Sequence, residues 1–306
     1  MKFRIYKILL VLILGFLDSA LFAQDLEPRS LSAMPTGGNF AIASYGYSSG
    51  NIMVDNSLPI EDLNAQINNF VFAYARSFKL FNKLSKFDVI TPYSFGSFTG
   101  VVNQIDSSTA RNGLADPLLR LSIVLIGAKP LSPAEFMKQE QKKFKLGASV
   151  RVRLPLGQYD NTKFINLGAN RLGVRLGVAG SYSIRKKLIL EAHLNSWFFT
   201  ENKEFFNGNS IKQKPLLSAQ LHATYIFKPG VWFAASIGRS GMGETIVNGV
   251  EKDDLQKNSR FGAAFAYRLS KQNALKIAFT SGVSTRYGAN FTTFLVAYQF
   301  MWFDKT

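Results

Sequence analysis

The chain has 306 residues, no cysteine, and 36 lysine and arginine residues against 20 aspartate and glutamate residues, which gives a formal net charge of +16 at pH 7. The absence of cysteine excludes a disulfide framework, a thiolate metal site and a cysteine nucleophile, and the two histidines, His193 and His222, are too few for a histidine-rich metal centre. A charge of this size would suit a nucleic acid or an anionic membrane as partner, so its meaning depends on where the basic residues lie.

Residues 1–23 have the pattern of a secretion signal. Three basic residues within the first seven precede a ten-residue apolar run over 8–17, which is too short for a membrane-spanning helix of about 20 residues. A basic start, a short apolar run and small residues after it are typical of a signal peptide; the alternative is a buried N-terminal helix. We expect cleavage after Ala23, so that 24–38 forms an N-terminal periplasmic segment or a plug inside the folded domain.

The rest of the chain alternates between apolar and polar residues with a period of two. In 217–227, leucine, alanine, tyrosine and phenylalanine occupy one parity, and serine, glutamine, histidine and threonine occupy most of the other. Successive side chains of a strand point to opposite faces, so this pattern predicts strands with one apolar and one polar face. We expect about twelve strands, at 39–47, 66–78, 86–96, 116–126, 143–154, 172–184, 187–200, 216–227, 231–240, 259–269, 274–283 and 292–303.

The links between these strands alternate in length. Short links fall at 79–85, 185–186, 228–230 and 270–273, and longer ones at 48–65, 97–115, 155–171, 201–215, 241–258 and 284–291. Short periplasmic turns, longer outer loops and an even number of alternating strands are typical of transmembrane β-barrels, whereas a soluble β-sandwich has no reason to alternate its loop lengths. We therefore predict an all-β fold, a transmembrane antiparallel β-barrel over 39–303. It would lie in the outer membrane of a Gram-negative bacterium after signal-peptide export.

One long segment, 127–142, stands where a short turn is expected. Ser132, Pro133 and Glu135 have the spacing of a helix N-cap, a proline at the first helical position and a capping-box glutamate. We expect one short periplasmic helix here, either a plain surface helix or an element with a role in gating or partner binding.

The last predicted strand carries an outward aromatic stripe. Phe294, Tyr298, Phe300 and Trp302 share one parity, and aromatic residues near strand ends suit the interfacial girdles of membrane barrels. We expect the barrel to contact outer-membrane lipid and lipopolysaccharide, and to be assembled by the barrel-assembly machinery.

Eight short motifs spread over the mature chain carry a family resemblance. They are MPTGGNF at 34–40, LPIED at 58–62, PLGQY at 155–159, NLGANR at 166–171, WFFTEN at 197–202, PGVW at 229–232, NSR at 258–260 and TRYG at 285–288. As a set they resemble the outer-membrane transporter family named for the MetA pathway of phenol degradation. The resemblance implies a β-barrel that passes small organic compounds across the outer membrane, and it implies neither a particular solute nor any catalytic residue.

Strand parity selects the polar side chains that we expect to line a substrate path through the lumen. They are Arg120, Arg151, Arg153, Arg175, Glu191, His193, Gln220, His222, Arg268 and Lys276. Arg120, Arg153 and Arg175 fall on three adjacent strands, and such a basic patch would favour anionic or carboxylated solutes. The alternative is that these arginines pair with loop acids such as Asp116 and Asp160 and merely fill a narrow lumen.

We predict a channel, not an enzyme, that passes small organic solutes by facilitated diffusion, with aromatic or carboxylated compounds as candidates. One alternative is an outer-membrane hydrolase, which would need a Ser–His pair that reaches lipid at the outer leaflet; another is a structural barrel with a blocked lumen. We expect no cofactor and no metal, since no phosphate-binding loop, metal cluster or carboxylate dyad stands out. Sorted by predicted location, the basic excess falls in periplasmic turns and on strands, which leaves no basic face for nucleic acid.

Overall fold

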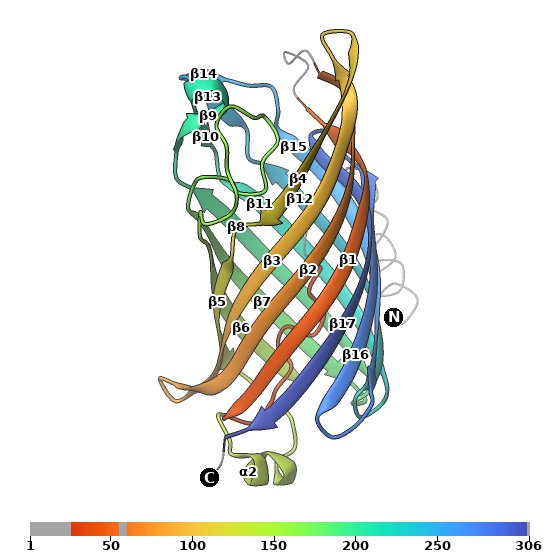
Figure 1. The fold of residues 1–306 in the computed structure, drawn as a ribbon. Coiled ribbons are helices and arrows are strands. Elements are labelled where there is room, and N and C mark those ends of the chain that lie inside the picture. Colours follow the sequence, from red (N-terminus) through yellow and green to blue (C-terminus); the bar gives the residue numbers. More distant parts are fainter. Residues whose placement is uncertain (1–25, 55–59, 305–306) are drawn as a thin grey trace, which may run out of the picture.

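The computed structural model describes residues 26–54 and 60–304, most of which belong to β-strands (Figure 1). The signal peptide and cleavage site predicted for residues 1–23 lie outside the described residues. The strands are β1 (Gly38–Met53), β2 (Ile60–Leu80), β3 (Lys83–Val102), β4 (Ile105–Leu114), β5 (Leu118–Ile126), β6 (Phe144–Arg153), β7 (Gly173–Ile184), β8 (Leu188–Phe199), β9 (Asn202–Phe205), β10 (Asn209–Gln213), β11 (Leu216–Lys228), β12 (Val231–Met242), β13 (Thr245–Val247), β14 (Val250–Glu251), β15 (Gln256–Arg268), β16 (Asn273–Ser284) and β17 (Gly288–Phe303). One short helix, α2 (Pro133–Lys138), and one 3-10 turn, η1 (Phe206–Gly208), complete the described elements.

One antiparallel sheet closes on itself to form the barrel. Neighbours around the sheet run β2, β1, β17, β16, β15, β12, β11, β8, β7, β6, β5 and β3, and β3 then pairs with β2. β4 pairs only with one end of β3, so the closed barrel has twelve strands, as predicted. The first and last strands meet over a continuous ladder, from the Gly38/Phe303 pair to the Met53/Gly288 pair.

The two ends of the barrel differ in the length of their connections. Long loops and the small sheet of β9, β10, β13 and β14 gather at one end, whereas short turns, α2 and the C-terminus lie at the other (Figure 1). We call these the outer end and the periplasmic end, since transmembrane barrels have long loops outside and short turns inside.

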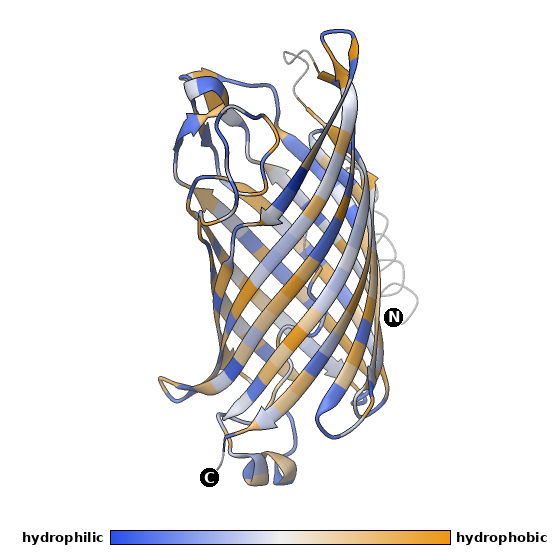
Figure 2. Cartoon of the chain, viewed as in Figure 1, coloured by the Kyte–Doolittle hydropathy of each residue, from blue (hydrophilic) through white to orange (hydrophobic). Residues whose placement is uncertain are grey.

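The two faces of the wall differ as the alternation predicts. On β11, Leu217, Leu221 and Tyr225 point outward and are 41–46% exposed. Gln220 and His222 on the same strand point inward and are buried. Figure 2 shows this mixture of apolar and polar residues along the barrel strands. An outward apolar face around a polar interior is the arrangement of a barrel surrounded by lipid.

The first three strands are longer than predicted. We expected outer loops at 48–65 and 97–115, but β1, β2 and β3 have 16, 21 and 20 residues and extend far into both segments. Beyond the membrane both faces of a hairpin meet water, so the apolar alternation fades although backbone pairing continues. For the same reason, alternation does not predict the small sheet of β9, β10, β13 and β14 at the outer end.

The helix α2 confirms the prediction made for its N-terminus. Ser132 is the N-cap, and the Ser132 and Glu135 side chains each accept a hydrogen bond from the other residue's backbone N–H, which completes the capping box. Hydrogen bonds from the hydroxyl and the backbone of Ser132 hold the pKa of Glu135 below its ordinary value. None of the described helices is long and apolar enough to cross a membrane.

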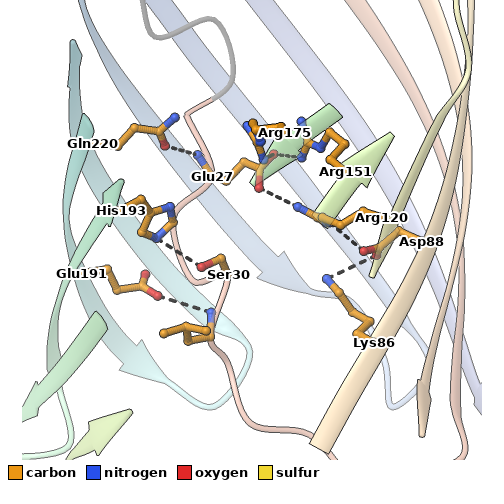
Figure 3. A network of polar contacts seen from close by, with 11 residues as sticks. Glu27, Ser30, Lys86, Asp88, Arg120, Arg151, Arg175, Glu191, His193 and Gln220 are labelled. Atoms are coloured by element: carbon orange, nitrogen blue, oxygen red, sulfur yellow. Dashed lines mark hydrogen bonds and ion pairs between the residues drawn. The ribbon is translucent and has the colours of Figure 1, made fainter. Parts of the chain in front are cut away.

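Residues 26–37 precede the wall and run inside it. At the periplasmic end, the backbone N–H of Thr36 donates to the Leu131 carbonyl at 2.8 Å and that of Gly37 to the Ser77 carbonyl at 2.9 Å. The segment then turns into the barrel, where it contacts side chains of β5, β6, β7, β8 and β11 (Figure 3). We call residues 26–37 the N-terminal segment.

A charge on the lipid-facing wall should destabilise the barrel. Leu194 on β8 points outward and is 61% exposed, and an arginine at the bilayer midplane costs about 2–4 kcal/mol in such barrels. Leu194→Arg should therefore lower the free energy of unfolding in phospholipid vesicles, measured by urea titration of tryptophan fluorescence. The control Leu194→Met should change it by less than about 1.5 kcal/mol. Equal unfolding midpoints for the two variants would contradict a membrane-facing wall.

Candidate functional site

Three arginines of the wall converge on one carboxylate of the N-terminal segment, that of Glu27 (Figure 3). Arg120 Nη1 lies 2.5 Å from Oε2 of Glu27. Arg151 Nη2 bonds the other oxygen, Oε1, from which Arg175 Nη2 lies 3.5 Å away. The backbone N–H of Glu27 also donates to Gln220 Oε1 at 3.4 Å. We call Glu27 and the three arginines the arginine site.

The strand register explains why the arginines meet. Arg120 on β5 pairs with Arg151 on β6, and Arg151 pairs with Arg175 on β7. Side chains of directly paired residues lie on the same face about 5 Å apart. The wall therefore presents three guanidinium groups in one row across three strands.

A second carboxylate, that of Asp88 on β3, balances part of this charge. Arg120 Nε donates to Asp88 Oδ2 at 2.7 Å, and Lys86 Nζ lies 3.3 Å from Asp88 Oδ1. Buried charges persist only when they are paired and hydrogen-bonded. The cluster holds four positive charges, on Lys86 and the three arginines, and two negative charges, on Asp88 and Glu27. Removal of the Glu27 carboxylate therefore raises its net charge from +2 to +3.

The segment is also held through its backbone and one apolar side chain. The backbone N–H groups of Arg29 and Leu31 donate to the two carboxylate oxygens of Glu191 on β8. Leu31 packs against Leu84 and Val124 of the wall. These contacts fix the course of the chain between the periplasmic end and Glu27.

The two histidines lie next to each other, on the periplasmic side of the arginine site. Ser30 Oγ lies 3.1 Å from His193 Nε2, and the His193 and His222 ring centroids are 4.7 Å apart. His222 Nδ1 in turn lies 2.8 Å from Ser236 Oγ. Within the described part of the chain, no three histidine, aspartate or glutamate side chains are close enough together to hold a metal ion. His193 therefore contacts the segment directly, and His222 packs against His193.

Two aromatic rings face the lumen beside the arginine site. The Trp197 and Phe199 rings lie 6° from parallel with centroids 5.9 Å apart. The Arg175 guanidinium lies 5.7 Å from the Trp197 centroid, and that of Arg153 lies 5.8 and 5.3 Å from the two rings. The guanidinium carbon of Arg171, in the loop before β7, lies 4.6 Å from the Phe199 ring centroid. Guanidinium groups are attracted to ring faces at these distances. We call the two rings and the three arginines beside them, Arg153, Arg171 and Arg175, the aromatic ladder.

The structure brings most of the predicted lumen residues together. Those that contact or adjoin the N-terminal segment or the aromatic ladder are Arg120, Arg151, Arg153, Arg175, Glu191, His193, Gln220 and His222. Lys276 on β16 interacts electrostatically with Glu27 and His222. Arg268 lies apart from both clusters, since it is exposed and donates to carbonyls of the β15–β16 turn.

The predicted pairing with loop acids holds for one arginine. Arg153 Nε lies 3.8 Å from Asp116 Oδ2. Asp160 instead bonds Lys163 and Thr162 within its own loop. The wall arginines are thus balanced mainly by carboxylates that the sequence does not point to.

Sequence reasoning misses Glu27, Asp88, Trp197 and Phe199. Strand parity could have found the two rings, since both occupy inward positions of β8. Asp88 also lies at an inward position, but on a strand whose phase is ambiguous in the sequence. Glu27 belongs to no strand, so only the folded chain shows which wall it meets.

Comparison with known proteins yields one family and several barrels of similar fold. A model of the family described as "Putative MetA-pathway of phenol degradation" matches residues 43–298. An outer membrane channel from Pseudomonas putida F1 has a TM-score of 0.75 and 19% sequence identity, over 91% of this chain and 100% of that chain. The β domain of the Bordetella autotransporter BrkA has a TM-score of 0.50 and 12% identity, over 87% of this chain and 100% of that chain. No curated protein matches the sequence.

Loss of the Glu27 charge should loosen the N-terminal segment. Glu27→Gln removes the carboxylate that three arginines share, and breaking a buried ion pair costs about 3–5 kcal/mol. Departure of the segment lowers this cost, because it lets water reach the arginines. Because the chain has no cysteine, Ser30→Cys introduces a single thiol on the segment. We expect this thiol to react with a water-soluble maleimide several-fold faster when Glu27→Gln is also present.

The matched control is Glu135→Gln, which makes the same chemical change at the exposed cap of α2. It should leave the rate of the Ser30→Cys thiol unchanged. Equal maleimide rates with and without Glu27→Gln would show that the arginine site does not hold the segment.

Proposed function

This chain belongs to the MetA-pathway family of phenol degradation, and we propose that it is an outer-membrane channel that passes small organic solutes by facilitated diffusion. We propose further that 24–38, freed by removal of a signal peptide at 1–23, acts as a displaceable plug in the lumen. The observation that carries this proposal is a closed barrel whose charged interior meets the N-terminal segment mainly through side chains of the wall.

The lining of the barrel suits a solute path. Arg151, Glu191 and His222 are 2%, 4% and 3% exposed, although each points into the lumen. Interiors of channel barrels are polar, and charged side chains at a narrow point select solutes by charge. A barrel filled only for stability would more simply hold apolar side chains, because buried ion pairs add little net stability.

The N-terminal segment narrows this path. A cavity beside Glu27, Ser30 and His193 has a volume of about 30 Å³, which is room for about one water molecule. Toward the periplasmic end a larger cavity of about 960 Å³ lies between the segment and the chain around α2. The segment thus leaves little space on the β5–β8 side of the arginine site, and we propose that it moves when an organic solute passes.

The contacts of the segment allow such movement. Residues 26–35 contribute no strand to the wall, and the backbone hydrogen bonds of Thr36 and Gly37 anchor the segment at the periplasmic end. Movement of 26–35 therefore breaks no ladder hydrogen bond of the barrel. Ion pairs and hydrogen bonds to Glu27, Arg29 and Ser30 can be replaced by water or by a polar solute. We therefore assign facilitated diffusion, with the plug displaced in each passage, as the mode of transport.

The outer wall suits lipid and lipopolysaccharide as its surroundings. Phe294, Tyr298 and Phe300 on β17 point outward and are 57%, 44% and 38% exposed. Aromatic residues of this kind anchor barrels at the membrane interfaces. We propose that the same C-terminal strand is the feature that barrel-assembly machinery recognises after export.

The hydrolase alternative requires a different arrangement of serine and histidine. The pairs Ser30–His193 and Ser236–His222 both lie inside the wall, and neither faces lipid at the outer end. Among the described residues, no carboxylate hydrogen-bonds either histidine ring to orient it as a base. Nothing in this geometry favours an enzyme over a channel.

Planar-bilayer recordings test the channel proposal. A variant that lacks residues 24–36 keeps every barrel strand and loses the plug. We expect the full mature chain to show small or infrequent conductance steps, and the truncated variant to show stable steps that are several-fold larger. Glu27→Gln should fall between the two.

Heat-modifiable migration on a gel should show that the truncated variant is still a closed barrel. A folded but silent truncated barrel, together with unchanged solute uptake in a strain that lacks the protein, would support the structural barrel with a blocked lumen instead.

A further inference from the structure

We infer that the arginine site and the aromatic ladder form one binding site for aromatic carboxylates, and that Glu27 occupies its anion-binding half when no solute is bound. The inference rests on the proposed channel function and specifies its solute. The solute class has a carboxylate on an aromatic ring or one carbon away from it.

The anion-binding half is already shaped around a carboxylate. Arg120 binds one oxygen of Glu27, and Arg151 binds the other. Guanidinium groups recognise carboxylates because their N–H donors form a rigid fork that matches the two oxygens. These donors belong to paired strands of the wall, whereas the carboxylate arrives on a segment without strand pairing. A solute carboxylate can therefore take the place of Glu27 without any change in the wall.

The aromatic half lies on β8, the strand that pairs with β7 on the side away from Arg151. Trp197 pairs with Arg175 across β7 and β8, and Phe199 pairs with Gly173 one inward position farther out. A Cβ atom at Gly173 would lie 3.4 Å from each of Arg153, Trp197 and Phe199. These are ordinary van der Waals distances, so Gly173 lies directly beside the Arg153 guanidinium group and the two rings. An aromatic solute ring can stack against such rings and face the same guanidinium groups.

Arg175 joins the two halves. Its Nη2 atom lies 3.5 Å from the Glu27 carboxylate, and its guanidinium carbon lies 5.7 Å from the Trp197 centroid. A carboxylate in the place of Glu27 is therefore separated from an aromatic surface by a single guanidinium group. An aliphatic carboxylate would use only the first half, and a neutral aromatic compound only the second. A solute with both groups uses the whole site.

Binding of such a solute displaces the N-terminal segment. Glu27 and the solute carboxylate compete for the same donors, and the space beside the segment, about 30 Å³, cannot hold an aromatic ring. Aromatic carboxylates should therefore open the channel as they bind, whereas a neutral solute has no group that replaces Glu27.

Bilayer recordings with three probes of similar size test this inference on the full mature chain. The probes are benzoate, cyclohexanecarboxylate, which lacks the aromatic ring, and benzyl alcohol, which lacks the charge. The concentration of each probe that gives half of its maximal change in conductance is measured. We expect the value for benzoate to be about tenfold below those for the other two.

Variants assign the preference to the two halves of the site. Trp197→Leu and Phe199→Leu should remove the difference between benzoate and cyclohexanecarboxylate. Phe198→Leu is the matched control, because Phe198 lies between them with its ring outward and 44% exposed. Arg175→Gln should raise the half-maximal concentrations of both carboxylates and leave that of benzyl alcohol unchanged.

The comparison of probes on the unmodified chain decides the inference even if a variant fails to fold. Equal half-maximal concentrations for benzoate and cyclohexanecarboxylate would overturn it, and so would an equal response to benzyl alcohol. If the barrel without residues 24–36 still conducts, these results leave the channel proposal intact. A truncated barrel that is folded and silent would instead overturn the proposed function itself.

Discussion

Every backbone N–H and C=O group that meets lipid must be paired within the chain, because each unpaired group costs several kcal/mol in a bilayer. The ladder between β1 and β17 meets this requirement by joining the two ends of the sheet. Closure then divides the side chains of each strand into an outward set, which faces lipid, and an inward set, which faces a shared lumen. The polar chemistry of the protein follows from this division.

We propose that charge, rather than apolar packing, determines what binds in the lumen. The pairing of β5, β6 and β7 sets three arginines in one row, and a row of like charges in a confined space demands an anion. In the resting protein that anion is Glu27, which the chain itself supplies. In the proposed mechanism, Glu27 competes with the solute for this anion site. We propose that the same three guanidinium groups set both the affinity for the solute and the closure of the empty path.

The wall could be predicted from the sequence because its physical cause is local. Where a strand faces lipid on one side, alternation marks its bounds closely: 143–154 is predicted and Phe144–Arg153 is found, and 172–184 is predicted and Gly173–Ile184 is found. β2 and β3 extend beyond the membrane, where both faces meet water and alternation no longer marks a strand.

The site could be predicted only in part. Parity places Arg120, Arg151 and Arg175 on the inward face, but their common partner is far away in the sequence and belongs to no periodic element. Arg268 shows the limit of parity at a strand end, because an inward position there lets the side chain fold back onto the carbonyls of its own turn.

We propose that the N-terminal segment rests inside the barrel at the arginine site and leaves when an aromatic carboxylate binds. Pulsed electron paramagnetic resonance tests it directly, with spin labels at Pro28→Cys on the segment and Lys271→Cys in the exposed β15–β16 turn of a chain that has no other cysteine. We expect a single narrow distance distribution without solute and a second, shifted distribution that grows with benzoate. A broad distribution without solute, or a narrow one that saturating benzoate leaves unchanged, would contradict it.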